Sequence, residues 1–162
     1  MESDQHIELR MRYENYLDDF GKCASKSLQQ TGRIDLSGLD YWQFPLLLIL
    51  GDPQIPVKMI PDLAAFETFM SPAYKPLSER GWLGIGRITS FEVSAASETT
   101  ALLSVSGDRL DGDGQVMNGW DLFYLHARRD GKWVQTCVMN KNPRCLAGED
   151  LFRWAQALQT IA

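Results

Sequence analysis

The dipeptide Asp130-Gly131 constrains the fold of this chain more than any other feature. It separates two long runs of strand-forming residues within VMNGWDLFYLHARRDGKWVQTCVMN, the stretch from Val116 to Asn140. Asp-Gly between such runs is typical of a two-residue type I′ turn, whose twist matches that of two antiparallel strands. The stretch therefore predicts a long β-hairpin.

A two-residue turn also predicts which residues of the hairpin lie opposite each other. The expected pairs are Arg129 with Lys132, Ala127 with Val134, Leu125 with Thr136, Phe123 with Val138 and Asp121 with Asn140. Because side chains alternate between the two faces of a sheet, the last four of these pairs share one face. A bulge that slips the register by one residue would exchange the faces.

The two faces of this predicted hairpin differ in their chemistry. One is small and apolar with a carboxylate and an amide at its far end, and it is interpreted as a pocket wall: Ala127, Val134, Leu125, Thr136, Phe123, Val138, Asp121 and Asn140. The other is aromatic and amphipathic, and it is interpreted as facing solvent or a partner: Arg128, Trp133, His126, Gln135, Tyr124, Cys137, Leu122, Met139, Trp120 and Lys141.

Composition excludes several classes of protein. With 162 residues, 44% hydrophobic and 23% charged, the chain is expected to form one soluble globular domain. A net charge of −5 argues against binding to nucleic acid. The long apolar run, Phe44 to Leu50, is too short to span a membrane. The charged N-terminus lacks a secretory signal, and the three cysteines form no CxxC pair, which together favour a reducing, cytoplasmic setting.

An amphipathic helix is predicted over residues 6 to about 30, because apolar residues recur there at spacings of three and four. Its stripe consists of Leu9, Tyr13, Tyr16, Phe20 and Cys23, and Thr31-Gly32 supplies a stop. Most of this stripe is expected to pack in the core. A buried tyrosine needs a hydrogen-bonding partner, so Tyr13 or Tyr16 could also direct its hydroxyl into a pocket.

The middle of the chain predicts short elements. Residues 41–50 are expected to form a bent or edge strand, because Pro45 cannot donate to a central ladder. Residues 57–60 form a short strand or an extended lead into a helix. That helix opens at Pro61-Asp62, is expected to break at Ser71-Pro72 and resumes as a second short helix over residues 74–80.

The remaining chain predicts strands over residues 83–96 and 99–109, the hairpin, and a final amphipathic helix over about 148–161. Helices followed by a run of antiparallel strands are typical of the α+β class. We therefore expect one domain over residues 1–162, with its core at about 6–141 and a C-terminal helical extension.

Several motifs are set aside. GWLGIG at residues 81–86 lies between a helix and a strand, the reverse of the order that a dinucleotide fingerprint requires. The aspartates near residue 111 lack the bidentate glutamate of a calcium loop. His6 and His126 lie on different elements with no further zinc ligand. Neither a metal nor a cofactor is expected. Arg109, at a strand end, is expected at the surface, paired with Asp111 or Asp121.

A long first helix with tyrosines, a strand with an internal proline, broken helices and four long strands ending in DGKW resemble the nuclear transport factor 2-like superfamily, in its SnoaL-like branch. The stretch from Arg109 through DGDG to Tyr124 is similar to a branch of unassigned function. The resemblance covers about residues 6–141. It implies a curved antiparallel sheet wrapped around helices into a cone with an apolar pocket, and dimers formed through the outer sheet face. Fold alone does not decide between enzymes and binding proteins.

The resemblance transfers unevenly to individual residues. Among ketosteroid isomerases of the superfamily, a first-helix tyrosine and a protonated aspartate donate to an oxyanion; Tyr13 or Tyr16 and Asp121 could match them. The catalytic base of those enzymes is an aspartate before a proline on the first strand, where this chain has Phe44. In related cyclases a late-strand aspartate acts as acid or base, and Asp121 could do so alone. His126 cannot supply the base if the predicted register holds.

Three hypotheses remain. The first is a dimeric, cone-shaped domain that binds a small, largely apolar molecule, with these residues near the pocket: Tyr13, Tyr16, Trp42, Trp82, Asp121 and Asn140. The second is an isomerase, cyclase or dehydratase acting on a ketone-containing substrate; an Asp121 pKa well above about 3.9 would support it. The third is an interaction module that dimerises through Trp120, Tyr124 and Trp133 without catalysis.

Overall fold

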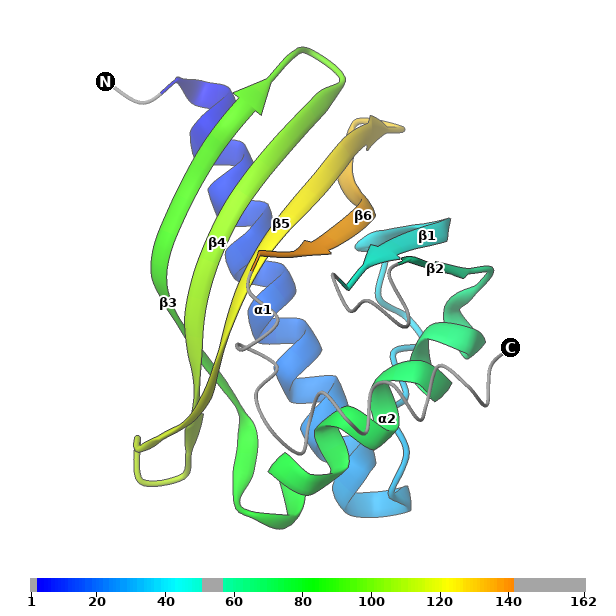
Figure 1. Cartoon of the computed structure of the whole chain (residues 1–162), viewed down its shortest axis with the longest axis vertical. Helices are drawn as coiled ribbons and strands as arrows, with labels where there is room; N and C mark the ends of the chain where they lie inside the picture. The colour runs from blue at the N-terminus through cyan, green and yellow to red at the C-terminus, as the bar shows by residue number, and fades with distance from the viewer. Residues whose placement is uncertain (1–2, 51–56, 142–162) are drawn as a thin grey trace.

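The structure is a computed structural model that describes residues 3–50 and 57–141. Within these residues the elements follow the order α1 (Asp4–Thr31), β1 (Trp42–Ile49), β2 (Val57–Ile60), α2 (Leu63–Glu79), β3 (Trp82–Ala96), β4 (Thr100–Asp111), β5 (Val116–Arg129) and β6 (Lys132–Asn140). The strands form one curved sheet that holds α1 on its concave side, with α2 across one end (Figure 1). The predicted α+β class is confirmed. The predicted C-terminal helix lies outside the described residues.

The sheet has the strand order β2-β1-β6-β5-β4-β3. Its neighbours are antiparallel except for β1 and β6, which run parallel and make the sheet mixed. Strand β1 is not at an edge, because it pairs on both sides. Its register against β6 is interrupted between Trp42 and Leu47, the segment that contains Pro45. Of the two predicted alternatives, the edge strand is therefore wrong, and the interrupted register is what the bent strand leads one to expect, since proline supplies no N–H to the ladder.

The first helix follows the predicted stripe. Ser3 caps its N-terminus by accepting a hydrogen bond from the His6 backbone, and Gly32, at φ 74°, ends it. Gly21 is required for packing: a Cβ there would lie 1.9 Å from the carbonyl oxygen of Gly84 on β3. Gly84 itself has φ 90°, and a Cβ added to it would lie 2.3 Å from the carbonyl oxygen of Gly21. Helix and strand therefore touch backbone to backbone, which fixes how far α1 lies from the sheet.

Helix α2 is continuous, and the predicted break at Ser71-Pro72 is wrong. Pro72 and Pro76 both lie inside the helix, each at the cost of one backbone hydrogen bond. Apolar side chains on both sides of Pro72 are buried, among them Phe69 and Leu77. Tertiary packing of this face outweighs the local helix-breaking effect of proline. None of the helices in the described ranges is long and apolar enough to cross a membrane.

The hairpin turn at Asp130-Gly131 is confirmed. Both residues have positive φ, 49° and 76°, as a type I′ turn requires. The predicted pairs next to the turn are also correct: Arg129 and Ala127 of β5 lie opposite Lys132 and Val134 of β6. The local sequence therefore predicts this end of the hairpin fully.

Farther from the turn the predicted register is wrong. A shift between Leu125 and His126 leaves Thr136 as the extra residue of a β-bulge, so that Leu125 pairs with Cys137 and not with Thr136. The predicted pairs of Phe123 with Val138 and of Asp121 with Asn140 are displaced in the same way: the observed pairs are Phe123 with Met139 and Leu122 with Asn140. A bulge has no composition signal strong enough to predict it here.

The predicted assignment of the faces is wrong along β5. Trp120, Tyr124 and His126 point toward α1 and are buried, whereas Phe123 and Leu125 lie on the opposite, outer face. Strand β6 changes phase at its bulge: Gln135 precedes it on the inner face, and Val138 and Asn140 follow it on that same face. The interface predicted from Trp120, Tyr124 and Trp133 is thus also wrong, because all three are interior.

Candidate functional site

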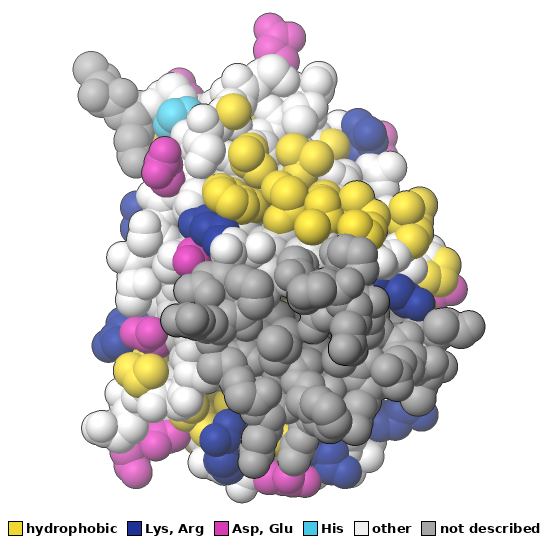
Figure 2. Space-filling view, in the orientation of Figure 1, with side chains coloured by type: hydrophobic (Ala, Val, Ile, Leu, Met, Phe, Trp, Pro, Cys, Tyr) yellow, Lys and Arg dark blue, Asp and Glu magenta, His cyan; other side chains and the backbone are white. Residues whose placement is uncertain are grey.

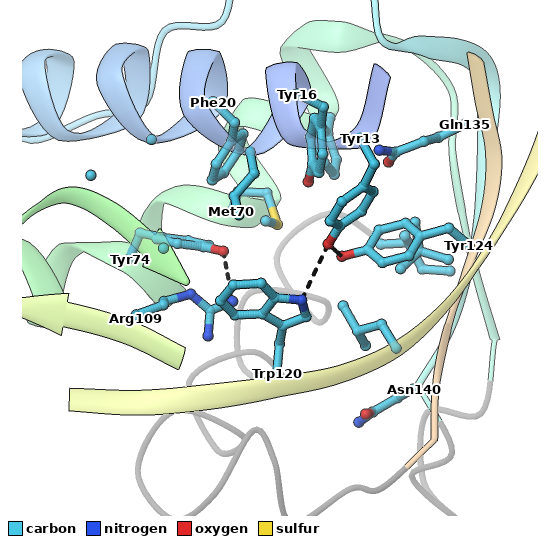
Figure 3. Close-up of a pocket in the computed structure, with 18 of the residues that line it drawn as sticks. Tyr13, Tyr16, Phe20, Met70, Tyr74, Arg109, Trp120, Tyr124, Gln135 and Asn140 are labelled. Carbon is cyan, nitrogen blue, oxygen red and sulfur yellow. Dashed lines mark hydrogen bonds between the residues drawn. The ribbon is translucent and has the colours of Figure 1, made fainter. Parts of the chain in front are cut away.

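A cavity lies between α1, α2 and the inner face of the sheet, and it encloses about 70 Å³ of free space. Its wall is dominated by aromatic side chains from both helices and from strands β3 and β5: Tyr13, Tyr16, Phe20, Phe66, Tyr74, Trp82, Trp120 and Tyr124. Figure 3 shows most of them. Aliphatic side chains such as Leu122 and Val138 fill much of the rest. Such a cavity has room for a few water molecules or a short ligand, and a larger ligand requires side chains to move.

A short chain of hydrogen bonds joins Trp120, Tyr13 and Tyr124 in the wall of the cavity (Figure 3). The Tyr13 hydroxyl donates to the Tyr124 hydroxyl at 3.1 Å, and the Trp120 indole Nε1 donates to the Tyr13 hydroxyl at 3.2 Å. Burial, followed by the nearby Tyr16, raises the pKa of Tyr13 far above its ordinary value. Burial and the neighbouring Tyr13 raise the pKa of Tyr124 in the same way. These hydroxyls therefore stay neutral and serve to position groups.

Arg109 is the single cation among the described residues that line the cavity. Its Nη2 donates to the Tyr74 hydroxyl at 2.9 Å. Its Nη1 donates to the side-chain oxygen of Asn118 at 3.1 Å and to the carbonyl oxygen of Gly119 at 3.2 Å. The expectation that Arg109 lies at the surface and pairs with Asp111 or Asp121 is wrong, because it follows the inward-facing residues of β4.

Two amide side chains at the cavity have unused hydrogen-bonding groups. Gln135 is 1% exposed, and within the described chain neither its Oε1 nor its Nε2 has a partner that meets the full hydrogen-bond geometry. The Tyr16 hydroxyl is close enough for the amide of Gln135 to act against the strong rise that burial gives the pKa of Tyr16. The Oδ1 of Asn140 is equally unpartnered there, while its Nδ2 reaches the Leu50 carbonyl oxygen at 3.5 Å. Buried polar groups in native proteins are almost always paired. A group that enters the cavity could supply the missing partners.

The residues predicted to surround a pocket fall into two groups. Tyr13, Tyr16, Trp82 and Asn140 line the cavity, and the Tyr16 hydroxyl points into it (Figure 3). Trp42 does not: its ring packs behind the wall, 6.0 Å from that of Tyr16 and 5.3 Å from that of Phe66. Whether any of these residues binds a ligand stays a prediction.

Asp121 lies outside the cavity, on the outer face of β5. It accepts a hydrogen bond from the Ser106 hydroxyl at 2.7 Å and pairs with Lys141 at 3.1 Å. Although partial burial raises the pKa of Asp121, the bonds from Ser106 and Lys141 outweigh that effect and lower it. The carboxyl is therefore ionised at neutral pH, the opposite of the neutral donor that the resemblance implied. Asp121 lies there because side chains alternate along β5 and the face that carries Trp120 and Tyr124 packs on α1.

Two further residues bear on acid–base chemistry. His126, expected to face away, is on the inner face, and burial lowers its pKa to about 4. The imidazole is therefore neutral at pH 7. Phe44, which occupies the position of the base in the isomerases, packs 6.3 Å from the ring of Phe66. No Asp or Glu occurs among the described residues that line the cavity.

Arg109 is the functional candidate that sequence reasoning missed, and a signal for it was present. Ala101, Leu103 and Val105 of β4 alternate with more polar residues and all point inward. Two more steps of the same period reach Gly107 and Arg109. Tyr74 was missed because the predicted helix break obscured its place on the buried face of α2.

A family model described as NTF2-like protein (DUF6841) matches residues 8–143, and no curated protein matches. A function-unknown protein from Mycobacterium tuberculosis has a similar structure, with a TM-score of 0.52 at 10% identity over 98% of this chain and 88% of that one. A Novosphingobium aromaticivorans protein, provisionally named an aromatic ring hydroxylase, gives 0.50 at 12% identity over 83% and 85%. At these identities the likeness shows a shared fold.

Proposed function

This chain belongs to the NTF2-like protein family DUF6841, and from that premise we propose that it binds a small, largely apolar molecule in the cavity beside α1. The observation that carries the proposal is the wall itself. Aromatic and aliphatic side chains form most of it, while a few polar groups, including the unpartnered amide of Gln135, converge on the space. Ligand sites of proteins commonly combine a mostly apolar wall with a few placed polar groups.

Native mass spectrometry of the purified protein, compared with the same sample after denaturation, tests this proposal first. A retained ligand adds mass that disappears on denaturation. If no ligand is retained, the unliganded protein is titrated with hexanol while two-dimensional NMR follows the signals of Trp120 and Tyr124. Saturable shifts at these two residues support binding inside the cavity. A clean mass together with an absence of such shifts contradicts it.

A pair of variants on one strand gives the matched control. Leu122→Trp places a larger side chain into the cavity, and it is expected to displace the ligand or to weaken hexanol binding. Leu125→Trp makes the same substitution on the outer face of β5 and is expected to leave binding unchanged. Equal loss in both variants would show that the effect comes from the strand and not from the cavity.

We also propose that two copies associate through the outer sheet face. Figure 2 shows a band of hydrophobic side chains over β5, β6 and β1. Cross-strand neighbours form this row, which runs over Leu102, Leu125, Cys137, Leu47 and Met59. Met59 is 54% exposed, Leu47, Leu102 and Leu125 are partly exposed, and Cys137 is buried between them. An apolar patch on a sheet face is typical of protein interfaces.

Analytical ultracentrifugation tests this association. Leu125→Glu places a charge in the centre of the hydrophobic band and is expected to give monomers if wild type is a dimer. Ile7→Glu, at an exposed apolar residue on α1, is the control and is expected to leave the dimer intact. A monomeric wild-type protein, or a dimer that Leu125→Glu leaves unchanged, contradicts the proposal.

The enzymatic alternative, an isomerase, cyclase or dehydratase with Asp121 as acid or base, has less support from the geometry. Asp121 lies on the far side of β5 from the cavity, and its pKa is lowered by Ser106 and Lys141. An acid that donates a proton at neutral pH needs a raised pKa. Titration of Asp121 by NMR tests this alternative, which requires a value well above the ordinary range for aspartate.

A further inference from the structure

Arg109 carries a charge that the described part of the chain does not neutralise. Its three acceptors are a hydroxyl, a side-chain amide and a backbone carbonyl, and all of them are uncharged. Arginine remains protonated in proteins. Arg109 is partly buried. A guanidinium in such a position usually gains a carboxylate partner, because an unpaired charge is costly to bury. The cavity has space for a carboxylate beside Arg109, but the described residues that line it include no Asp or Glu.

The guanidinium is held in place by its surroundings. Its central carbon lies 5.0 Å from the ring centre of Tyr74 and 5.3 Å from that of Trp120. These rings and the hydrogen bonds to Asn118 and Gly119 restrict its orientation. A group fixed in this way loses little conformational entropy when it binds a ligand.

Arg109 also has N–H donors that no described residue accepts from. A guanidinium offers five N–H donors, and the described residues accept from two on Nη1 and from one on Nη2. No described residue accepts from Nε, and Tyr74 takes one of the two hydrogens of Nη2. The Nε and Nη2 groups form one edge of the guanidinium, the geometry that binds a carboxylate through two parallel hydrogen bonds.

The rest of the cavity would accept the apolar part of such a ligand. Phe20, Met70 and Leu122 offer hydrophobic contact, and the neutral tyrosines add no negative charge that would repel an anion. The side-chain amide of Gln135, which also lines the cavity, offers a further hydrogen-bonding group. One fixed cation in a small space matches a monoanion better than a phosphate, which carries more charge and is larger.

We propose that the ligand of this cavity is a small carboxylate, bound through its two oxygens to the Nε–Nη2 edge of Arg109, with its apolar chain against Phe20, Met70 and Leu122. This inference rests on the proposed function, because it names the chemical class of the molecule that the cavity binds. It assigns Arg109 as the residue that selects the ligand by charge.

The direct test compares two probes of nearly equal shape. Hexanoate and hexanamide are titrated separately into the unliganded protein, and NMR follows the side-chain Nε of Arg109 and the indole Nε1 of Trp120. We expect hexanoate to bind at least about tenfold more tightly, because its hydrogen bonds to arginine are charge-assisted. Equal dissociation constants for the two probes overturn the proposal without any variant.

Three variants assign the preference to one side chain. Arg109→Gln removes the charge and is expected to abolish the preference for hexanoate, while Arg109→Lys keeps the charge without the fork and retains part of it. Arg87→Gln removes the same charge from an exposed pair with Asp108 and is expected to change nothing. If Arg109→Gln does not fold, the decision rests on wild type, Arg109→Lys and Arg87→Gln. An unchanged preference in Arg109→Lys together with a loss in Arg87→Gln would show general charge attraction and overturn the assignment.

The outcomes separate this inference from the proposed function. If hexanol, hexanoate and hexanamide all bind in the cavity with similar affinity, the proposed apolar binding stands and the preference for a carboxylate is refuted. Binding of hexanoate that shifts signals at the surface alone refutes the site at Arg109. No binding of hexanol, hexanoate or hexanamide refutes both statements.

Discussion

The two faces of strand β5 alternate residue by residue, yet they differ in almost every physical property. On the inner face Trp120 and Tyr124 are buried and are joined by hydrogen bonds through Tyr13. On the outer face Asp121 and Phe123 remain partly exposed, where Lys141 approaches both of them. Neighbours in the sequence thus occupy a dry interior and a wet surface.

This difference shows that side-chain type alone does not identify the inner face. Both faces of β5 contain apolar and polar residues, so either one could have packed on α1. What decides is the large aromatic surface: burying Trp120 and Tyr124 removes more apolar area from water than burying Phe123 and Leu125. The outer face keeps the charge, which is costly to bury. The following predictions test how sharply the two faces differ.

The largest difference is expected between two leucines on strand β4. Leu103 is fully buried on the inner face, whereas its neighbour Leu102 is partly exposed on the outer face. Leu103→Ala is expected to lower the free energy of unfolding by roughly 2–5 kcal/mol, through lost burial and a new cavity. Leu102→Ala should cost less than about 1.5 kcal/mol. Urea denaturation of both variants measures the difference, and equal losses would contradict the assignment of the faces.

The second prediction concerns the pH dependence of stability, which we expect His126 on the inner face to influence. Burial is the main cause that lowers the pKa of His126 to about 4; the Tyr124 backbone opposes this lowering and the nearby Arg12 adds to it. The unfolded chain binds this proton near pH 6.5. The unfolded state therefore gains the proton first, and stability is expected to fall as the pH drops from about 6.5 to about 4. The loss attributed to this group is roughly 3 kcal/mol and levels off below that range.

Urea denaturation at several pH values, with stability expressed relative to pH 8, measures this dependence. His126→Gln removes the titrating group and is expected to flatten the curve between pH 6.5 and 4. The absolute stability of the variant does not matter for this comparison. A variant that keeps the full wild-type slope would show that another group causes it.

The local features of the fold could be predicted from the sequence because each depends on neighbouring residues. The spacing of Leu9, Tyr13, Tyr16 and Phe20 predicts α1, and Asp130-Gly131 predicts the turn of the hairpin. The candidate pocket residues on α1 follow from the same periodicity. These signals need no knowledge of the rest of the chain.

The features that were missed depend on contacts between distant segments. The bulge at Thr136 reverses the phase of β6, and no residue type marks its position. Pro72 lies inside a helix because packing on both sides of it stabilises α2. The parallel pairing of β1 with β6 is equally non-local. Only Arg109 could have been placed in advance, by extending the alternation of β4.

The third prediction compares polar networks on the two faces. Tyr13→Phe leaves the Trp120 indole N–H and the Tyr124 hydroxyl without their buried partner, at an expected cost of about 1–3 kcal/mol. Ser106→Ala removes a hydrogen bond to Asp121 on the outer face, where water can replace it, and should cost less than about 1 kcal/mol. Thermal and urea denaturation measure both. A Tyr13→Phe variant as stable as wild type would show that the inner network is solvated.

The smallest effect is expected for Asp121, because water screens its pair with Lys141; their side chains are 30% and 20% exposed. Hydrogen bonds from Ser106 and Lys141 lower the pKa of Asp121 despite partial burial. Its contribution is therefore present above the unfolded pKa, about 3.9, and is lost as the pH falls through the lower folded value. Asp121→Asn is expected to cost at most about 1 kcal/mol at pH 7 and nothing in strong acid.

Salt and a second variant identify where this contribution comes from. High salt should reduce the effect of Asp121→Asn, and Lys141→Met should add little to it, since both variants remove the same pair. If Asp121→Asn instead cost several kcal/mol or abolished hexanol binding, Asp121 would act on the cavity and the two faces of β5 would be energetically coupled. A small, salt-dependent loss with unchanged binding would leave the chemistry of the cavity to Arg109, the tyrosines and Gln135.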